Sequence, residues 1–180
     1  TVNFAGREYT PFGRAAQATT PLTFSGVVSM QPGSNYTITA ATTYYNGLPY
    51  FYSSTTINYG NLTFNCNGTV TNLSLGRVDN LTFGTTVAAV TSSTGSIKLY
   101  GDVLNSSPNA IALGNLTLAG TVAQTIGGTG AGTFSATNLS VSNNAGVTLS
   151  KALSLSGSLS FGNVNNASLS TGGLLTLTSS

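Results

Sequence analysis

The sequence has very little charge and no histidine. Asp, Glu, Lys and Arg make up 4% of its 180 residues, against about 25% in ordinary globular proteins. Five cations and three carboxylates give a formal net charge of +2. Because so few scattered cations cannot neutralise a row of phosphates, we do not expect nucleic acid as a partner. Solubility must therefore come from the hydroxyls and amides of Ser, Thr and Asn.

The same scarcity argues against an enzyme and against a bound metal. The three carboxylates, Glu8, Asp79 and Asp102, lie far apart in the sequence, and there is no histidine to act as a base or a metal ligand. Asp79 and Asp102 could stack on successive coils beside Arg77 and Lys98 to form a site. We instead interpret them as solvated turn residues with weak mutual pairing. We therefore expect no catalysis, no metal and no cofactor.

Cysteine and long apolar runs are scarce as well. The single thiol, Cys66, cannot form an internal disulfide, and we interpret it as a small half-buried residue at a strand end. No apolar run approaches the roughly 20 residues of a membrane-spanning helix, and the start at Thr1 is unlike a signal peptide. The glycine-rich GGTGAG at 127–132 has no acid, which indicates a flexible turn and not a calcium-binding repeat. We expect a processed, soluble fragment.

What the sequence does have is an alternation of small polar and apolar residues. Within residues 137–164, eight large apolar side chains fall on odd positions, so an extended chain would point them all to one side. Turn-like clusters such as NNAG and SGS interrupt the series, so each strand is short and resumes with the same side inward. We predict that these eight residues form a core ladder: Leu139, Val141, Val147, Leu149, Leu153, Leu155, Leu159 and Phe161.

A short phrase, Asn-Leu-Thr/Ser followed by an apolar residue, recurs along the chain. Its copies include GNLTF at 60–64, DNLTF at 79–83, GNLTL at 114–118 and TNLSV at 137–141. The leucine landmarks of the phrase and its looser copies are Leu62, Leu81, Leu116, Leu139, Leu159 and Leu175. They are separated by 19, 35, 23, 20 and 16 residues, and the gap of 35 divides in two if GSIKLY around Ile97 is a degenerate copy. A period of roughly 20 residues is typical of a solenoid.

These patterns predict an all-β fold, a right-handed parallel β-helix (β-solenoid), with an antiparallel β-sandwich as the alternative. Helix is disfavoured because Ser, Thr, Asn and Gly are abundant and no 3.6-residue period is sustained. Coils stacked about 4.8 Å apart would give a rod of about 40 Å. We expect residues 1–58 to form an irregular, aromatic-containing cap, and residues 59–180 to form solenoid repeats that continue beyond the fragment.

The predicted cap holds the one concentration of aromatic residues. Exposed rings can stack on sugar faces, although the same rings can also pack the cap. The candidate ligand-contact residues are Tyr44, Tyr45, Tyr50, Phe51, Tyr52 and Tyr59. Rows of outward Thr, as in YTITA and LLTLTSS, raise ice binding as a further possibility. Nine Asn-x-Ser/Thr sequons are present, and the repeated phrase accounts for most of them.

The segment AQTIGGTGAGTFSATNLSVSNNAGVTLSKALSLSGSLSF, followed by LSTGGLLTLTSS, resembles the repeat modules of giant secreted surface adhesins of Bacteroidota. This family of β-strand-repeat proteins is exported by the type IX system and includes adhesins used in gliding motility. The resemblance is good over residues 124–180, loose over 59–118 and slight before residue 59.

The resemblance implies an extracellular, outer-membrane-attached location and the secretion and surface-anchoring machinery that goes with it. The expected function is that of a structural or adhesive segment of a cell-surface filament, acting through rigidity, reach and weak multivalent contacts. Cell-surface or environmental glycans are the expected partners. A discrete glycan-binding or ice-binding β-helix domain is the alternative.

Overall fold

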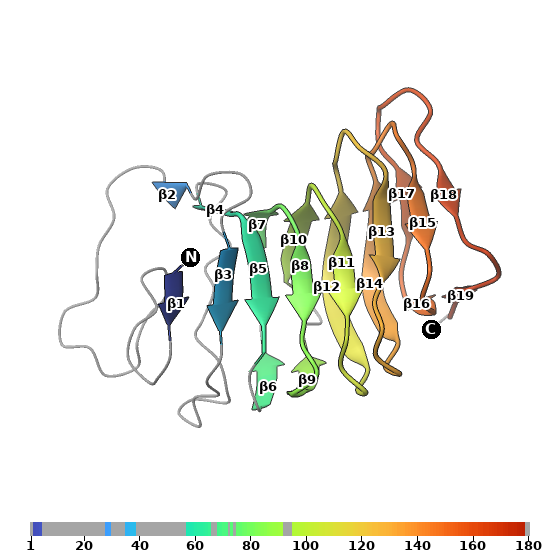
Figure 1. Cartoon of the computed structure of the whole chain (residues 1–180). Helices are drawn as coiled ribbons and strands as arrows, with labels where there is room; N and C mark the ends of the chain where they lie inside the picture. Colours follow the sequence, from blue (N-terminus) through green and yellow to red (C-terminus); the bar gives the residue numbers. More distant parts are fainter. Residues whose placement is uncertain are drawn as a thin grey trace.

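The chain folds as an all-β, right-handed parallel β-helix of about 5 turns, shown by a computed structural model (Figure 1). The structure describes residues 2–4, 28–29, 35–38, 57–65, 68–71, 73, 75–91 and 95–178, with side chains from residue 60 onward. The predicted solenoid is confirmed, and the antiparallel sandwich is wrong. Every strand pairing between described residues is parallel, from β1 with β3 to β16 with β19.

Two parallel sheets form the wall of the solenoid, with β1 at one end of the stack and β18 and β19 at the other (Figure 1). The 8-stranded sheet runs in the order β1 (Val2–Phe4), β3 (Asn35–Ile38), β5 (Asn61–Phe64), β8 (Leu81–Phe83), β11 (Val103–Asn105), β13 (Gln124–Gly127), β15 (Val147–Leu149) and β18 (Leu169–Ser170). The main path of the 11-stranded sheet is β2 (Val28–Ser29), β4 (Ile57–Tyr59), β7 (Leu75–Val78), β10 (Ser96–Leu99), β12 (Ile111–Leu118), β14 (Phe134–Val141), β16 (Leu153–Leu155) and β19 (Leu175–Leu177). Strands β6 (Gly68–Thr71), β9 (Val87–Thr91) and β17 (Leu159–Phe161) lie off this path.

The 11-stranded sheet is bent, so a coil has three short faces. Strand β12 pairs with β9 through its first residues and with β10 through its last four, and β14 divides in the same way between β16 and β17. The side-chain alternation slips at each bend: Leu113 and Gly114 are both buried in β12, and Thr137 and Asn138 are both partly exposed in β14. We call the 8-stranded sheet face 1, the β6–β9–β16–β19 part face 2, and the β7–β10–β17 part face 3.

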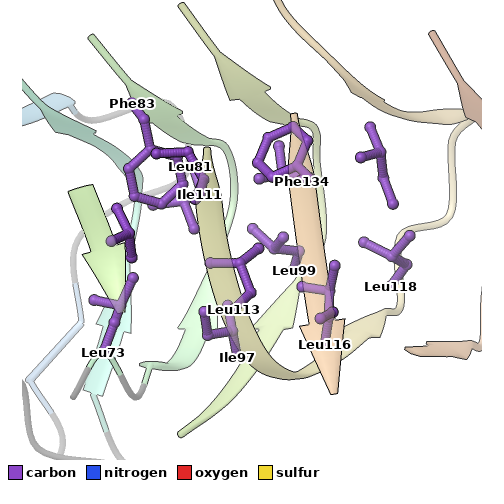
Figure 2. Packing of buried hydrophobic residues seen from close by; sticks show 14 of the residues in the cluster. Leu73, Leu81, Phe83, Ile97, Leu99, Ile111, Leu113, Leu116, Leu118 and Phe134 are labelled. Carbon is purple, nitrogen blue, oxygen red and sulfur yellow. The ribbon is translucent and has the colours of Figure 1, made fainter. Parts of the chain in front are cut away.

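Apolar side chains stack in columns inside the coil, since residues in register on successive parallel strands point to the same side. On face 1 one column runs Leu62, Leu81, Val103, Ile126 and Leu149, all at most 4% exposed. In the same sheet the rings of Phe64 and Phe83 stack with centroids 5.7 Å apart. Figure 2 shows side chains from the three faces filling the space between the strands.

The predicted core ladder is correct for six of its eight residues. Leu139, Val141, Val147, Leu149, Leu153 and Leu155 are all buried, with at most 4% of each side chain exposed. Leu159 is half-buried against the core. The prediction is wrong for Phe161, which is 52% exposed. Phe161 is in register with buried Val141, but among the described residues no strand covers the other edge of β17.

The recurring Asn-Leu phrase does not mark a single column. Leu62 and Leu81 belong to face 1, whereas Leu116 and Leu139 belong to face 3 and Leu175 to face 2. Ile97 is in register with Leu116, so GSIKLY is a degenerate copy on face 3. The gaps of 35 and 16 residues are therefore changes of face. Register partners are 19 residues apart at Leu62 and Leu81 and 23 apart at Ile126 and Leu149.

Strands of both sheets occur before residue 59, within the region predicted to be a cap. Strands β1 and β3 pair in parallel with the rest of face 1, and β2 pairs with β4 in the other sheet. The regular stacking therefore includes short parts of residues 1–58. The other residues of that region lie outside the described structure, and the cap stays a prediction.

Candidate functional site

The aromatic residues proposed to contact ligand lie almost entirely outside the described structure. Tyr44, Tyr45, Tyr50, Phe51 and Tyr52 lie outside the described residues. Tyr59 ends β4, where its backbone is in register with Val78, and its side chain is not described. Their role in binding stays a prediction.

The asparagine of the recurring phrase forms hydrogen-bonded ladders between coils. On face 1 the Asn80 Nδ2 donates to Asn61 Oδ1 at 2.7 Å, and Asn80 Oδ1 accepts from the Asp102 backbone N–H at 2.7 Å. On face 3 the Asn138 Nδ2 donates to Asn115 Oδ1 at 2.7 Å. These asparagines hold the coils together, so four of the sequons have amides that already serve the fold.

A second set of polar side chains is fully buried at the corners of the coil. Gln124 is 1% exposed and Asn143 is 0% exposed, and Asn143 Nδ2 donates to Gln124 Oε1 at 2.8 Å. Asn105 and Ser107 are also 0% exposed, and Ser107 Oγ donates to the Val87 carbonyl at 2.7 Å. Because these groups are amides and hydroxyls bonded to one another or to backbone, they act as structural supports and carry no acid or base chemistry.

The glycine-rich turn at 127–132 packs closely against the preceding coil. A Cβ on Gly130 would lie 2.1 Å from the Ser107 carbonyl oxygen, and one on Gly132 would lie 1.8 Å from the Asn109 carbonyl oxygen. Gly130 N–H also donates to the Asn105 carbonyl at 3.1 Å. The sequence indicated a flexible turn, but the glycines are required because the turn lies directly against the backbone of the preceding coil.

The two described aspartates, Asp79 and Asp102, stand in neighbouring columns of face 1. Asp102 follows Asn80 in the face 1 ladder, and its Oδ1 accepts from the Thr125 backbone N–H at 2.7 Å. The Asp79 carbonyl accepts from Gly101 N–H, so Asp79 belongs to the neighbouring column. No group of three His, Cys, Asp or Glu residues that could hold a metal occurs in the described parts of the chain.

Two cations and one tyrosine meet on the outer surface of face 3. The Arg77 Cζ lies 3.6 Å from the centroid of the Tyr100 ring, and the Lys98 Nζ lies 5.5 Å from it. These contacts are within the range of cation–π attraction. We call these three residues the Arg77 cluster.

A β-bulge in β7 positions Arg77. Leu75 pairs with Ile97 and Val78 pairs with Leu99, so Gly76 and Arg77 together stand opposite Lys98. Both residues of the bulge are half-exposed. An extra residue re-aims the side chain at a bulge, which accounts for Arg77 lying over the Tyr100 ring. A guanidinium, an ammonium and an aromatic ring grouped in this way can bind an anion or pack against a sugar.

Sequence reasoning considered Arg77 and Lys98 only as neighbours of the two aspartates, and it did not select Tyr100. The alternation of Ile97 and Leu99 with Lys98 and Tyr100 places both polar residues outside. This alternation is visible within one strand. The position of Arg77 over the Tyr100 ring depends instead on the register between coils and on the bulge, which no pattern within one strand reveals.

The outer faces carry rows of hydroxyl groups that are short or mixed. On face 3, Lys98 is followed in register by Thr117, Ser140 and Ser160. On face 1, Thr63 and Thr82 are in register, but the next residue of the row is Leu104. A lattice-matching surface needs an unbroken row, so the threonine row of face 1 does not favour ice binding.

The described residues contain no helix long and apolar enough to cross a membrane. Comparison with models of protein families, with curated proteins and with solved structures found no match for this chain.

Proposed function

We propose that the chain is a structural and adhesive segment of a long secreted cell-surface filament. The observation that carries the proposal is the stack of in-register apolar columns inside an outer surface made mostly of hydroxyls and amides. In such a solenoid each coil is stabilised by its neighbours, so the fold extends by repetition and resists bending. A surface with so few charges suits many weak contacts better than one strong one.

The last described coil exposes large apolar side chains. Phe161 is 52% exposed and Leu177 is 63% exposed, although they are in register with buried Val141 and Leu155. Any β-strand or apolar surface that packs against β17 and β19, such as a coil of the same kind, would bury both side chains.

The finer parts of the proposal come from the sequence resemblance to Bacteroidota adhesins. These are export by the type IX system, attachment to the outer membrane, a role in gliding motility, and glycans as partners. They fit an extended β-solenoid with a polar surface.

The adhesive role is tested by comparing one copy with many. The chain is displayed at increasing density on beads, and attachment to glycan-coated surfaces and to cells is measured beside solution binding of the monomer. We expect little binding by the monomer and firm attachment that rises steeply with density, because linked weak contacts gain effective concentration. Tight binding of one soluble ligand by the monomer, with no gain on display, would replace the filament with a discrete binding domain.

A further inference from the structure

The Arg77 cluster joins two cations that have no carboxylate partner among the residues the structure describes. Arg77 and Lys98 stand opposite each other on the neighbouring strands β7 and β10. Neither forms an ion pair with a described carboxylate, and Asp102 Oδ1 already accepts from the Thr125 N–H. Like charges on adjacent strands destabilise a sheet, so the pairing is unfavourable unless an anion lies between them.

Arg77 also has a hydrogen-bond donor without an acceptor. Its Nε is buried and has no partner among the described residues. The guanidinium is held over the Tyr100 ring at 3.6 Å, which limits its freedom before any ligand arrives. A buried donor that stays unpaired lowers stability, so Arg77 is held in this position at a cost.

We propose that the Arg77 cluster binds the anionic groups, carboxylate or sulfate, of an acidic polysaccharide. A guanidinium can donate two parallel hydrogen bonds to such a group, and the exposed Lys98 ammonium adds a second charge. The choice of a glycan as ligand rests on the proposed adhesive function. The anion site itself rests on the geometry of the cluster.

The surface beside the cluster favours a polymer over a small anion. From Lys98 the outer row of face 3 continues through Thr117, Ser140 and Ser160, one residue per coil. Successive strands are about 4.8 Å apart, so these hydroxyls form a polar track parallel to the solenoid axis. A sugar chain held at Arg77 can follow this track and exchange hydrogen bonds with it.

The test uses the monomeric chain and the Arg77 Nε–H signal in ¹⁵N-resolved NMR spectra. The probes are oligogalacturonate, sulfated dextran, neutral dextran, polyglutamate and inorganic sulfate, compared at equal concentrations of anionic groups. We expect the two acidic glycans to shift the signal in a saturable way that weakens at high salt. Neutral dextran, polyglutamate and inorganic sulfate should have much smaller effects.

Matched variants assign the binding to the cluster. Arg77→Gln and Lys98→Gln should each weaken glycan binding by about tenfold, because each removes a charge-assisted contact. Lys151→Gln removes the same charge at a distant turn, where its Nζ donates to the Gly130 carbonyl, and should leave binding unchanged. Lys98 is exposed, so its variant keeps the test valid if the Arg77 variant folds poorly.

Several outcomes would overturn the proposal. An equal loss in the Lys151 variant would show attraction to net charge alone. Equal binding of polyglutamate would show a charge site with no carbohydrate selectivity, and an equal response to inorganic sulfate would show a bare-anion site. Absence of binding to both acidic glycans would disprove the anion site. It would not change the attachment of bead-displayed chains, so failure of the anion site and failure of the adhesive function are distinguishable.

Discussion

At the scale of single residues, the interior and the exterior are separated by parity. Leu155 is 0% exposed and in register with Ala136 above it and Leu177 below it, whereas its neighbour Ser156 is exposed. One step along the strand therefore moves a side chain from the dry core to the solvent.

This contrast gives a direct test of the core. Leu155→Asp would bury a charge with no partner, and we expect it to lower the free energy of unfolding by roughly 3 to 5 kcal/mol or to prevent folding. Ser156→Asp should change it by less than about 0.5 kcal/mol. Urea unfolding followed by circular dichroism measures both. Equal tolerance at the two positions would contradict the inward orientation of Leu155.

At the scale of strands, the asparagine ladders connect one coil to the next. Asn138 in β14 donates to Asn115 in β12, and its Oδ1 accepts from the Ser158 backbone N–H at 2.7 Å. The next coil approaches so closely that a Cβ on Gly157 would lie 2.4 Å from the Asn138 Oδ1. The ladder therefore requires an amide side chain at Asn138 and a glycine at Gly157.

Breaking this ladder should weaken the stack. Asn138→Leu leaves the Ser158 N–H without its acceptor and Asn115 without one donor, so we expect a loss of about 1 to 3 kcal/mol. Ser140→Ala, on the same strand and the outer side, is the matched control and should be nearly neutral. Thermal unfolding of the two variants is compared with that of the parent chain. If Asn138→Leu leaves the unfolding temperature unchanged, the ladder does not contribute to the stability of the stack.

At the scale of the whole molecule, the described coils are held together by stacking, and we expect no contribution from a metal. The described coils are joined by parallel ladders, apolar columns and amide ladders. We expect thermal unfolding with and without a chelator to have the same midpoint, because the sequence has one cysteine, no histidine and only three carboxylates, which lie far apart in the sequence. Differential scanning calorimetry measures it. A large fall of the midpoint with chelator would reveal a metal site that the sequence did not indicate.

The sequence by itself determined the fold class and the direction of most core side chains. Alternation with a period of two residues is a property of each strand alone. The six residues of the predicted core ladder from Leu139 to Leu155 were therefore correctly predicted to face inward. The length of the coil followed from the recurring phrase. Burial also requires a neighbouring coil, which is why Phe161 has the right register but remains exposed.

Only the tertiary structure decided which copies of the phrase share a face and where a binding cluster forms. Leu81 pairs with Val103 on face 1 and Leu116 with Ile97 on face 3, even though their phrases are nearly identical. The Arg77 cluster depends on one extra residue in β7 and on the register of β10, which bring Arg77 over Tyr100. Both are relations between coils, and they are fixed by packing over about 20 residues of intervening chain.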